Sequence, residues 1–143
     1  MIEREEKSIR SRMKRILIVE DNAYFMQFLK ETLHVRLPSI DIFEAKNGEE
    51  ALQRIEVLSP DTIFTDLRLP GANGLELTQK IKAKYPNTIV VIITNYDLPE
   101  YREAAYRFGA DHFLSKDSFL KMIHAISSNQ KLEQDDSNPN GLP

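Results

Sequence analysis

The sequence predicts an α/β fold built on a parallel sheet, and two observations support this. From Arg15 onward, short β-branched runs alternate with amphipathic stretches of about 11 to 15 residues, the pattern of repeated βα units. Several of the runs are apolar almost throughout, as strands covered on both faces should be. We count five such units between residues 14 and 129, and crossovers of one hand place helices on both faces of the sheet.

The first unit joins an apolar strand to an amphipathic helix. The strand at 15–20 is a continuous apolar run, and Asn22 is a candidate N-cap for a helix at 23–35. Pro38 ends the connection that follows. The core-facing side of the helix is expected to carry Phe25, Phe28, Leu29 and Leu33.

The second and third units repeat this pattern. A strand at 40–45 alternates apolar and polar residues, which suits a sheet edge, and a helix at 48–58 has one apolar face. A strand at 61–66 leads into the turn-rich segment 67–74, and a helix at 75–85 stops before a proline.

The last two units complete the sheet. The strand at 88–94 is the most hydrophobic run, and the helix at 98–108 is followed by Gly109, a residue type favoured just beyond a helix. A strand at 111–115 and a helix at 118–129 follow. The apolar face of that last helix is expected to carry Leu120, Ile123 and Ile126.

Composition limits the classes of protein and site. The chain has 143 residues, 41% of them hydrophobic and 29% charged, with a net charge of −3, so nothing favours binding to nucleic acid or to an anionic membrane. It has no cysteine, which excludes disulfides, thiolate metal sites and cysteine nucleophiles. No apolar stretch approaches the roughly 20 residues of a membrane span, and the N-terminus lacks the apolar segment of a secretory signal. We therefore expect a cytoplasmic protein.

Both ends of the chain differ in composition from the middle. Residues 1–13 are rich in charge, and residues 130–143 are polar with almost no apolar content. We expect a flexible N-terminal extension at 1–13 and a disordered tail at 130–143. The folded domain would then cover residues 14–129.

Chemically active residues stand at the ends of four expected strands. They are, in chain order, Glu20, Asp21, Asp66, Thr94 and Lys116. Because the carboxyl ends of parallel strands meet at one sheet edge, where open α/β sheets bind ligands, three carboxylates, a hydroxyl and an ammonium are predicted to converge. Each residue alone would also fit a structural role, but the coincidence at four strand ends favours a site.

Such a group suits Mg²⁺ and phosphate. Oxygen ligands from Glu20, Asp21 and Asp66 match the preference of Mg²⁺, which takes one or two carboxylates together with a phosphate oxygen. Asp66 is the candidate nucleophile for a phosphoryl group, with the cation offsetting the repulsion between acceptor and donor. Lys116 would pair with the carboxylate at rest and with the phosphoryl oxygens afterwards, and the Thr94 hydroxyl would donate to the same oxygens.

Other common motifs are absent from the sequence. There is no P-loop, no G-x-G-x-x-G after the first strand and no G-x-S-x-G, which argues against nucleotide, dinucleotide and serine-hydrolase readings. His34, His112 and His124 are isolated in the sequence and are interpreted as packing or surface residues.

Four segments resemble the receiver domain of two-component response regulators: 16–22, 66–77, 91–95 and 108–116. The resemblance covers the whole expected domain. It implies a (βα)5 doubly wound, flavodoxin-like fold with strand order 2-1-3-4-5. It also implies that Asp66 accepts a phosphoryl group from a phosphohistidine on a sensor histidine kinase or phosphotransfer protein.

The resemblance assigns further roles within the site. Mg²⁺ would be held by Glu20, Asp21, Asp66 and the backbone carbonyl of Arg68. Thr94 and Phe113 would be the switch pair: after phosphorylation the Thr94 hydroxyl moves toward the phosphoryl group and Phe113 turns inward. This repacks the surface of the fourth helix, fifth strand and fifth helix, biasing an existing two-state equilibrium.

Three positions depart from the family pattern. Asp117 replaces a proline that often follows the lysine, and because a non-proline cis bond costs about 3 kcal/mol we expect a trans bond there. Asp117 or Ser118 is then expected to cap the last helix. Arg68 and Asn95 are expected to border the path of an attacking water and to shift the lifetime of the phosphoryl group.

The sequence thus predicts a stand-alone, phosphorylation-activated switch that catalyses only its own phosphotransfer and dephosphorylation. Its output would be a protein target, since residues after 130 are too few and too polar for a DNA-binding module. Tyr96, Tyr101 and Tyr106 could serve as contacts on the surface of the fourth helix, fifth strand and fifth helix, or equally pack half-buried. The sequence does not identify the kinase or the target, and it leaves the oligomeric state open, a homodimer included.

Two alternatives belong to other classes. A small Mg²⁺-dependent phosphatase or phosphotransferase would place a second aspartate two residues after Asp66, where this chain has Arg68. A pseudo-receiver would act by protein binding alone, without phosphorylation. The intact acidic group argues against this second alternative.

Overall fold

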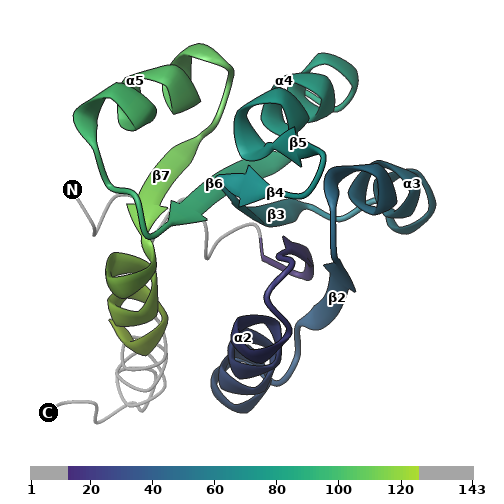
Figure 1. Cartoon of the computed structure of the whole chain (residues 1–143). Coiled ribbons are helices and arrows are strands. Elements are labelled where there is room, and N and C mark those ends of the chain that lie inside the picture. Colours follow the sequence, from purple (N-terminus) through teal and green to yellow (C-terminus); the bar gives the residue numbers. More distant parts are fainter. Residues whose placement is uncertain (1–12, 126–143) are drawn as a thin grey trace, which may run out of the picture.

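In the computed structural model, which describes residues 13–125, five parallel strands form one sheet in the order β2-β1-β3-β6-β7 (Figure 1). The strands are β1 (Arg15–Val19), β2 (Asp41–Ala45), β3 (Thr62–Asp66), β6 (Ile89–Thr94) and β7 (His112–Ser115). This confirms the predicted order 2-1-3-4-5, with β2 at an edge. Apart from Met13, the expected N-terminal extension lies outside the described residues, as does the expected tail.

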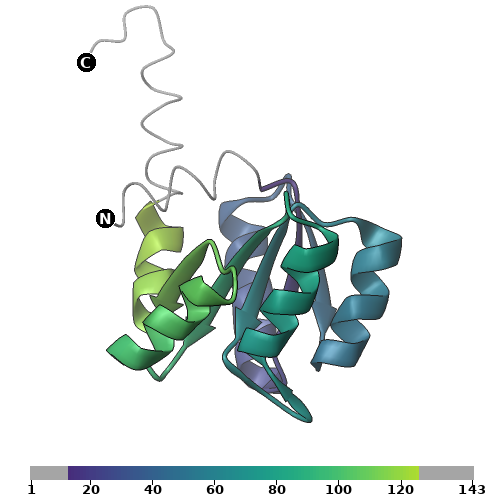
Figure 2. The same ribbon diagram turned by 90° about the horizontal axis from the view of Figure 1, so that it is seen from above.

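Helices cover both faces of the sheet (Figures 1 and 2). The helices named in Figure 1 are α2 (Ala23–Arg36), α3 (Gly48–Leu58), α4 (Gly74–Lys84) and α5 (Pro99–Arg107), and a further helix includes residues 116–125. Helix α2 and the 116–125 helix lie on one face, and α3, α4 and α5 lie on the other. None of the helices among residues 13–125 combines the length and the apolar character needed to cross a membrane.

Strand β1, which lies between β2 and β3, is buried on both faces, and its successive side chains point to opposite sides of the sheet. Ile16 and Ile18 belong to the core beneath α2 and the 116–125 helix. Leu17 and Val19 belong to the core beneath α3 and α4. A fully buried side chain of this size contributes roughly 1.5–3 kcal/mol, so the sheet is firmly anchored up to the ends of its strands.

The predicted apolar face of α2 is partly wrong, and that of the last helix is incomplete. In α2 the buried residues are Met26, Leu29 and Leu33, whereas Phe28 is 48% exposed. The buried stripe follows the 3–4 residue spacing from Met26, and Phe28 lies about 100° around the helix from Leu29. In the last helix Phe119 and Met122 join Ile123 in the core, Leu120 is half-buried, and the predicted Ile126 lies outside the described residues.

The start of the last helix also differs from the prediction. The helix begins at Lys116, and the Ser115 hydroxyl accepts a hydrogen bond from the Ser118 N–H at 3.0 Å. Ser115 is therefore the N-cap, and the prediction of Asp117 or Ser118 is wrong. The predicted trans bond before Asp117 is confirmed, since the described residues contain no cis peptide bond. Without a proline, the helix can include both Lys116 and Asp117.

The turn-rich segment after β3 is more ordered than the sequence indicates. It forms a two-stranded antiparallel sheet of β4 (Arg68–Leu69) and β5 (Ala72–Asn73). Gly71 makes the turn with a φ of 77°. The Asn73 side chain then accepts a hydrogen bond from the Glu76 N–H at 2.8 Å and caps α4. The backbone that follows Asp66 is therefore fixed at both ends.

We expect Gly74→Ala to distort the end of β3. A Cβ at this position would lie 2.3 Å from the backbone oxygen of Asp66, closer than unbonded atoms can approach. The free energy of unfolding should fall by about 2–3 kcal/mol in urea denaturation followed by circular dichroism. Gly71→Ala is the matched control, because its Cβ meets nothing within 4 Å and only its positive φ is penalised, by about 1 kcal/mol. Equal losses in the two variants would contradict this account of Gly74.

Candidate functional site

Strand register brings the predicted residues to one edge of the sheet. Val19 is paired with Thr65, so Glu20 and Asp66 are the next residues of two neighbouring strands. On the other side of β3, Asp66 is paired with Ile93, next to Thr94. Thr94 is in turn paired with Ser115, which directly precedes Lys116. The convergence predicted from the strand ends is thus present in the structure.

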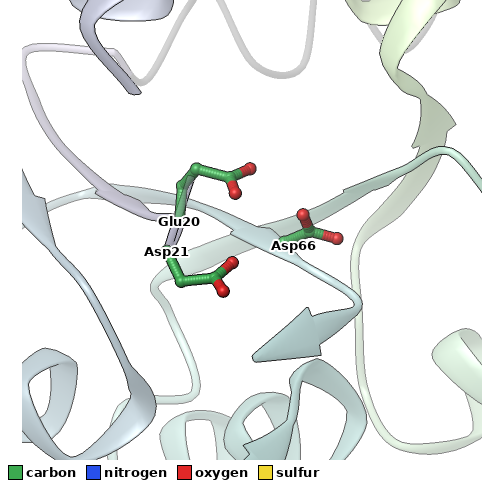
Figure 3. Close-up of side chains that lie close together, drawn as sticks. All are labelled: Glu20, Asp21 and Asp66. Carbon is green, nitrogen blue, oxygen red and sulfur yellow. The ribbon is translucent and has the colours of Figure 1, made fainter. Parts of the chain in front are cut away.

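Three carboxylates gather at this edge, Glu20 and Asp21 from the end of β1 and Asp66 from β3 (Figure 3). Each offers an oxygen within 4.8 Å of the other two. Glu20 and Asp66 are buried, and Asp21 is exposed. Negative charges this close repel one another, most strongly where burial weakens the screening by water, so the arrangement favours a bound cation.

Lys116 supplies part of the compensating charge. Its ammonium lies 3.3 Å from Glu20 Oε1 and 3.2 Å from Asp66 Oδ2. The lysine side chain is 16% exposed, so this contact is largely shielded from solvent. Lys116 therefore bridges the first and third strands, as the sequence analysis expected of its pairing with Asp66.

The environment of Glu20 is unusual for a carboxylate. Oε2 accepts a hydrogen bond from the Asn22 N–H at 3.0 Å, whereas the buried Oε1 has only the ion pair with Lys116 and no hydrogen bond. Burial, with the charge of Asp66, raises the Glu20 pKa from 4.5 to about 7, against the opposing effects of the Asn22 N–H and Lys116. A buried oxygen with an unused lone pair is a position where a ligand can bind. The carboxylate group as a whole fits Mg²⁺, a cation that prefers oxygen ligands.

Asp66 is held only loosely by hydrogen bonds. The Arg68 N–H donates to its Oδ1 at 3.3 Å, a long contact, and Oδ2 faces Lys116. The Asp66 side chain is 11% exposed, which leaves it accessible at the edge of the sheet. A carboxylate with few competing donors and an adjacent ammonium is suited to act as a nucleophile.

Thr94 and Phe113 are both fully buried. The Thr94 hydroxyl accepts a hydrogen bond from the Tyr96 N–H at 2.9 Å. Phe113 packs with Leu67, Ile92, Ala105 and Ala110. The Arg102 guanidinium lies 5.1 Å from its ring centroid and donates to the Phe113 carbonyl at 3.2 Å. Phe113 therefore points inward, into the cluster between the sheet and α5.

Two aromatic residues at the site have contacts that the sequence analysis missed. Tyr96 stacks under Arg68, with 4.0 Å between the guanidinium carbon and the ring centroid. Phe25, predicted to face the core, lies under Lys116, with 4.1 Å between the ammonium and the ring centroid. Both follow a site residue at short spacing, Tyr96 two residues after Thr94 and Phe25 four after Asp21, a signal that places them near the site but does not identify their contacts. Asn95, the other predicted neighbour, is exposed.

Comparison with known families agrees with this geometry. Residues 16–127 match the sequence model of the response regulator receiver domain. The chain belongs to the response regulator receiver domain family. The match begins in β1 and so spans every element that contributes to the site.

Several relatives of this receiver domain are longer proteins. It is 34% identical over 108 residues to a cyclic di-GMP phosphodiesterase of Thermotoga maritima, covering 76% of this chain and 28% of that protein. It is 30% identical over 119 residues to the nitrate/nitrite response regulator protein NarL of Escherichia coli, covering 80% of this chain and 55% of that protein. The receiver domain thus spans from 28% to 55% of the length of these relatives.

Solved receiver domains have the same fold. The signal receiver domain of the response regulator NarL from Mycobacterium tuberculosis is 27% identical with a TM-score of 0.72, covering 83% of this chain and 97% of that chain. A signal receiver domain of a DNA-binding response regulator from Colwellia psychrerythraea is 25% identical with a TM-score of 0.73, covering 82% of this chain and 98% of that chain.

We expect Glu20→Gln to change how stability depends on pH. The pKa of Glu20 is raised from 4.5 to about 7 in the folded state, so its contribution is complete below pH 4.5 and is lost as the pH rises through about 7. Glutamine does not titrate, so the variant does not lose this contribution. The free energy of unfolding of the variant minus that of wild type should therefore be about 1–3 kcal/mol larger at pH 8 than at pH 5.

The measurement is urea denaturation at both pH values in the presence of a chelator, so that no divalent cation contributes. Glu49→Gln is a matched control, because that glutamate is exposed at the start of α3. A variant-to-wild-type difference that is the same at pH 5 and pH 8 would contradict the assignment of the raised pKa to Glu20.

Proposed function

We propose that this receiver domain is a phosphorylation-activated signalling switch in which Asp66 accepts a phosphoryl group from a histidine kinase or phosphotransfer protein. The observation that carries the proposal is the Lys116 ammonium, which lies within 3.3 Å of both Glu20 and Asp66. Together with Asp21, these residues supply the negative charge that holds a cation and the positive charge that faces a phosphoryl group.

The chemistry is a displacement at phosphorus. An Asp66 oxygen forms the new O–P bond while the P–N bond of the phosphohistidine breaks, and the electron pair of that bond returns to the imidazole nitrogen. Lys116 then faces the phosphoryl oxygens instead of a free carboxylate. Glu20, Asp21, Asp66 and the Arg68 backbone carbonyl would hold Mg²⁺, which when bound offsets the repulsion between the anionic acceptor and donor.

Thr94 would report the presence of the phosphoryl group. Its hydroxyl now accepts a hydrogen bond from the Tyr96 N–H, and a hydroxyl can still donate one more bond. Donation to a phosphoryl oxygen would draw Thr94, and with it the backbone at Tyr96, toward Asp66. The loop that leads into α5 is therefore the first segment to respond.

The output surface in this proposal is formed by α5, β7 and the 116–125 helix. Tyr96 is 42% exposed and Tyr106 is 43% exposed, so both are available to a protein partner. Tyr101 is half-buried against the cluster around Phe113 and so joins the surface to the switch residue. We propose a protein target in the cytoplasm and no direct binding to DNA.

The alternative is a pseudo-receiver that works by protein binding without phosphorylation. In that case the partner would bind the unmodified domain. One experiment distinguishes the phosphorylation-activated switch from the pseudo-receiver.

We expect the protein to form a stoichiometric adduct when incubated with Mg²⁺ and acetyl phosphate, because a small donor needs no kinase surface. Mass spectrometry should show one phosphoryl group per chain, lost in Asp66→Asn and in the presence of a chelator. Asp61→Asn is the matched control. Asp61 lies outside the acidic group, at the opposite edge of the sheet, where its side chain accepts hydrogen bonds from the backbone N–H groups of Lys14 and Arg15.

Each other outcome points to a different class. Release of inorganic phosphate far above stoichiometry would support a phosphatase. Absence of any Mg²⁺-dependent change would support the pseudo-receiver and overturn the switch.

We expect the Arg68–Tyr96 pair to lengthen the life of the phosphoryl group. Arg68 follows β3 and Tyr96 follows β6, so their stack joins the two loops on either side of Asp66 and narrows the approach of water. Arg68→Ala and Tyr96→Ala should each speed loss of the phosphoryl group about three- to tenfold, and the double variant should add little. Loss is followed after removal of acetyl phosphate.

Two further variants sharpen this measurement. Asn95→Ala, which leaves the stack intact, tests the other predicted neighbour and should have the smaller effect. Tyr106→Ala is the control for loss of an exposed aromatic residue on α5. Unchanged rates in both Arg68→Ala and Tyr96→Ala would refute a role for the pair.

A further inference from the structure

We infer that Phe25 is a positioning residue for phosphoryl transfer: the face of its ring holds the Lys116 ammonium in place beside Asp66. The ammonium lies 4.1 Å from the ring centroid, well inside the roughly 6 Å over which ring faces attract cations. This inference rests on the proposed role of Asp66 as phosphoacceptor, and it adds a residue that belongs to none of the strand ends.

Lys116 needs such a contact because its other partners do not stay the same. Its ammonium is shared between Glu20 Oε1 and Asp66 Oδ2. During phosphoryl transfer the Asp66 carboxylate becomes an acyl phosphate, and its negative charge moves outward to the phosphoryl oxygens. Glu20 is among the residues that would hold Mg²⁺, which competes for its charge. The neutral ring of Phe25 is unchanged throughout.

The ring itself is held firmly. Phe25 is in the first turn of α2, and its N–H donates to the Asn22 side chain at 3.0 Å. The ring packs against the core beneath α2, and it stacks with the ring of Phe28 at a centroid distance of 6.4 Å and an interplanar angle of 29°. A lysine side chain has several rotatable bonds and loses considerable entropy when fixed, so a rigid neighbour limits the positions that it samples.

The contact also makes a purely structural explanation testable. If Phe25 only filled space beside the core, leucine would serve almost as well, because a half-buried apolar side chain would remain. If the ring face matters, only another aromatic residue can restore the attraction to the ammonium. Phe25→Leu and Phe25→Tyr therefore separate the two roles.

The first arm measures the rate of phosphorylation by acetyl phosphate in the presence of Mg²⁺. We expect Phe25→Leu to lower this rate about three- to tenfold, and Phe25→Tyr to stay within about twofold of wild type. Tyr24→Leu is the matched control: it removes an aromatic residue from the same turn, but one that is 90% exposed, and the rate should not change.

The second arm tests whether the effect passes through Lys116. In a Lys116→Met background, Phe25→Leu should cause no further loss of rate. A full additional three- to tenfold loss in that background would show that Phe25 acts independently of the lysine and would overturn the inference.

The third arm uses no phosphorylation at all. In the NMR spectrum of the unmodified, metal-free protein, the Lys116 methylene protons should be shifted by the aromatic ring, and the shift should vanish in Phe25→Leu and persist in Phe25→Tyr. A shift that survives in Phe25→Leu would refute the contact. If the shift behaves as expected but wild type takes up no phosphoryl group, the proposed function fails while the positioning of Lys116 stands.

Discussion

The rest of the site depends on one electrostatic constraint: two buried carboxylates share the Lys116 ammonium at the carboxyl edge of the sheet, and a third, exposed carboxylate lies beside them. Burying charges is costly, and one lysine cannot neutralise three negative charges. The unfavourable balance is visible at Glu20, whose pKa is raised to about 7 and whose Oε1 lacks a hydrogen bond. A site in this condition favours any ligand that brings positive charge, and it explains why the chemistry best supported here is the binding of a divalent cation and phosphate.

The domain can keep these unfavourably placed carboxylates because its stability comes from apolar packing elsewhere in the structure. The strands below the site are buried on both faces, and the aromatic pair of Phe64 and Phe119, with centroids 4.8 Å apart, packs the sheet against the last helix. The tight approach of Gly74 to the Asp66 carbonyl ties the start of α4 to the end of β3. Apolar burial of this extent can offset the cost of an unsatisfied carboxylate, so the protein can keep a reactive, poorly paired group in a stable domain.

Strand order and the positions of Glu20, Asp21, Asp66, Thr94 and Lys116 were predictable because they depend on patterns along the chain, namely apolar runs and the polar residues that end them. The contacts of Phe25 and Tyr96 were not. An aromatic residue near a helix start or in a loop satisfies the pattern of a core residue equally well, and its partner is decided by rotamers and by loops distant in sequence. The N-cap of the last helix was missed for a related reason. Ser115 is the last residue of a strand, and the same residue caps the helix that follows directly.

The position of Phe113 limits how the switch can work. A ligand shifts an equilibrium only through contacts that differ between two states, and the contacts that hold Phe113 inward do not include Asp66. Arg102 stabilises that arrangement through the Phe113 ring and carbonyl and through Asp97, which lies 3.1 Å from its guanidinium in the loop before α5. In the proposed switch, a phosphoryl group would act first on the Thr94–Tyr96 hydrogen bond and on the loop that carries Asp97. Signalling would therefore change the geometry of the loop before α5 more than the packing beneath it, and a partner would distinguish the two states mainly through Tyr96 and its neighbours.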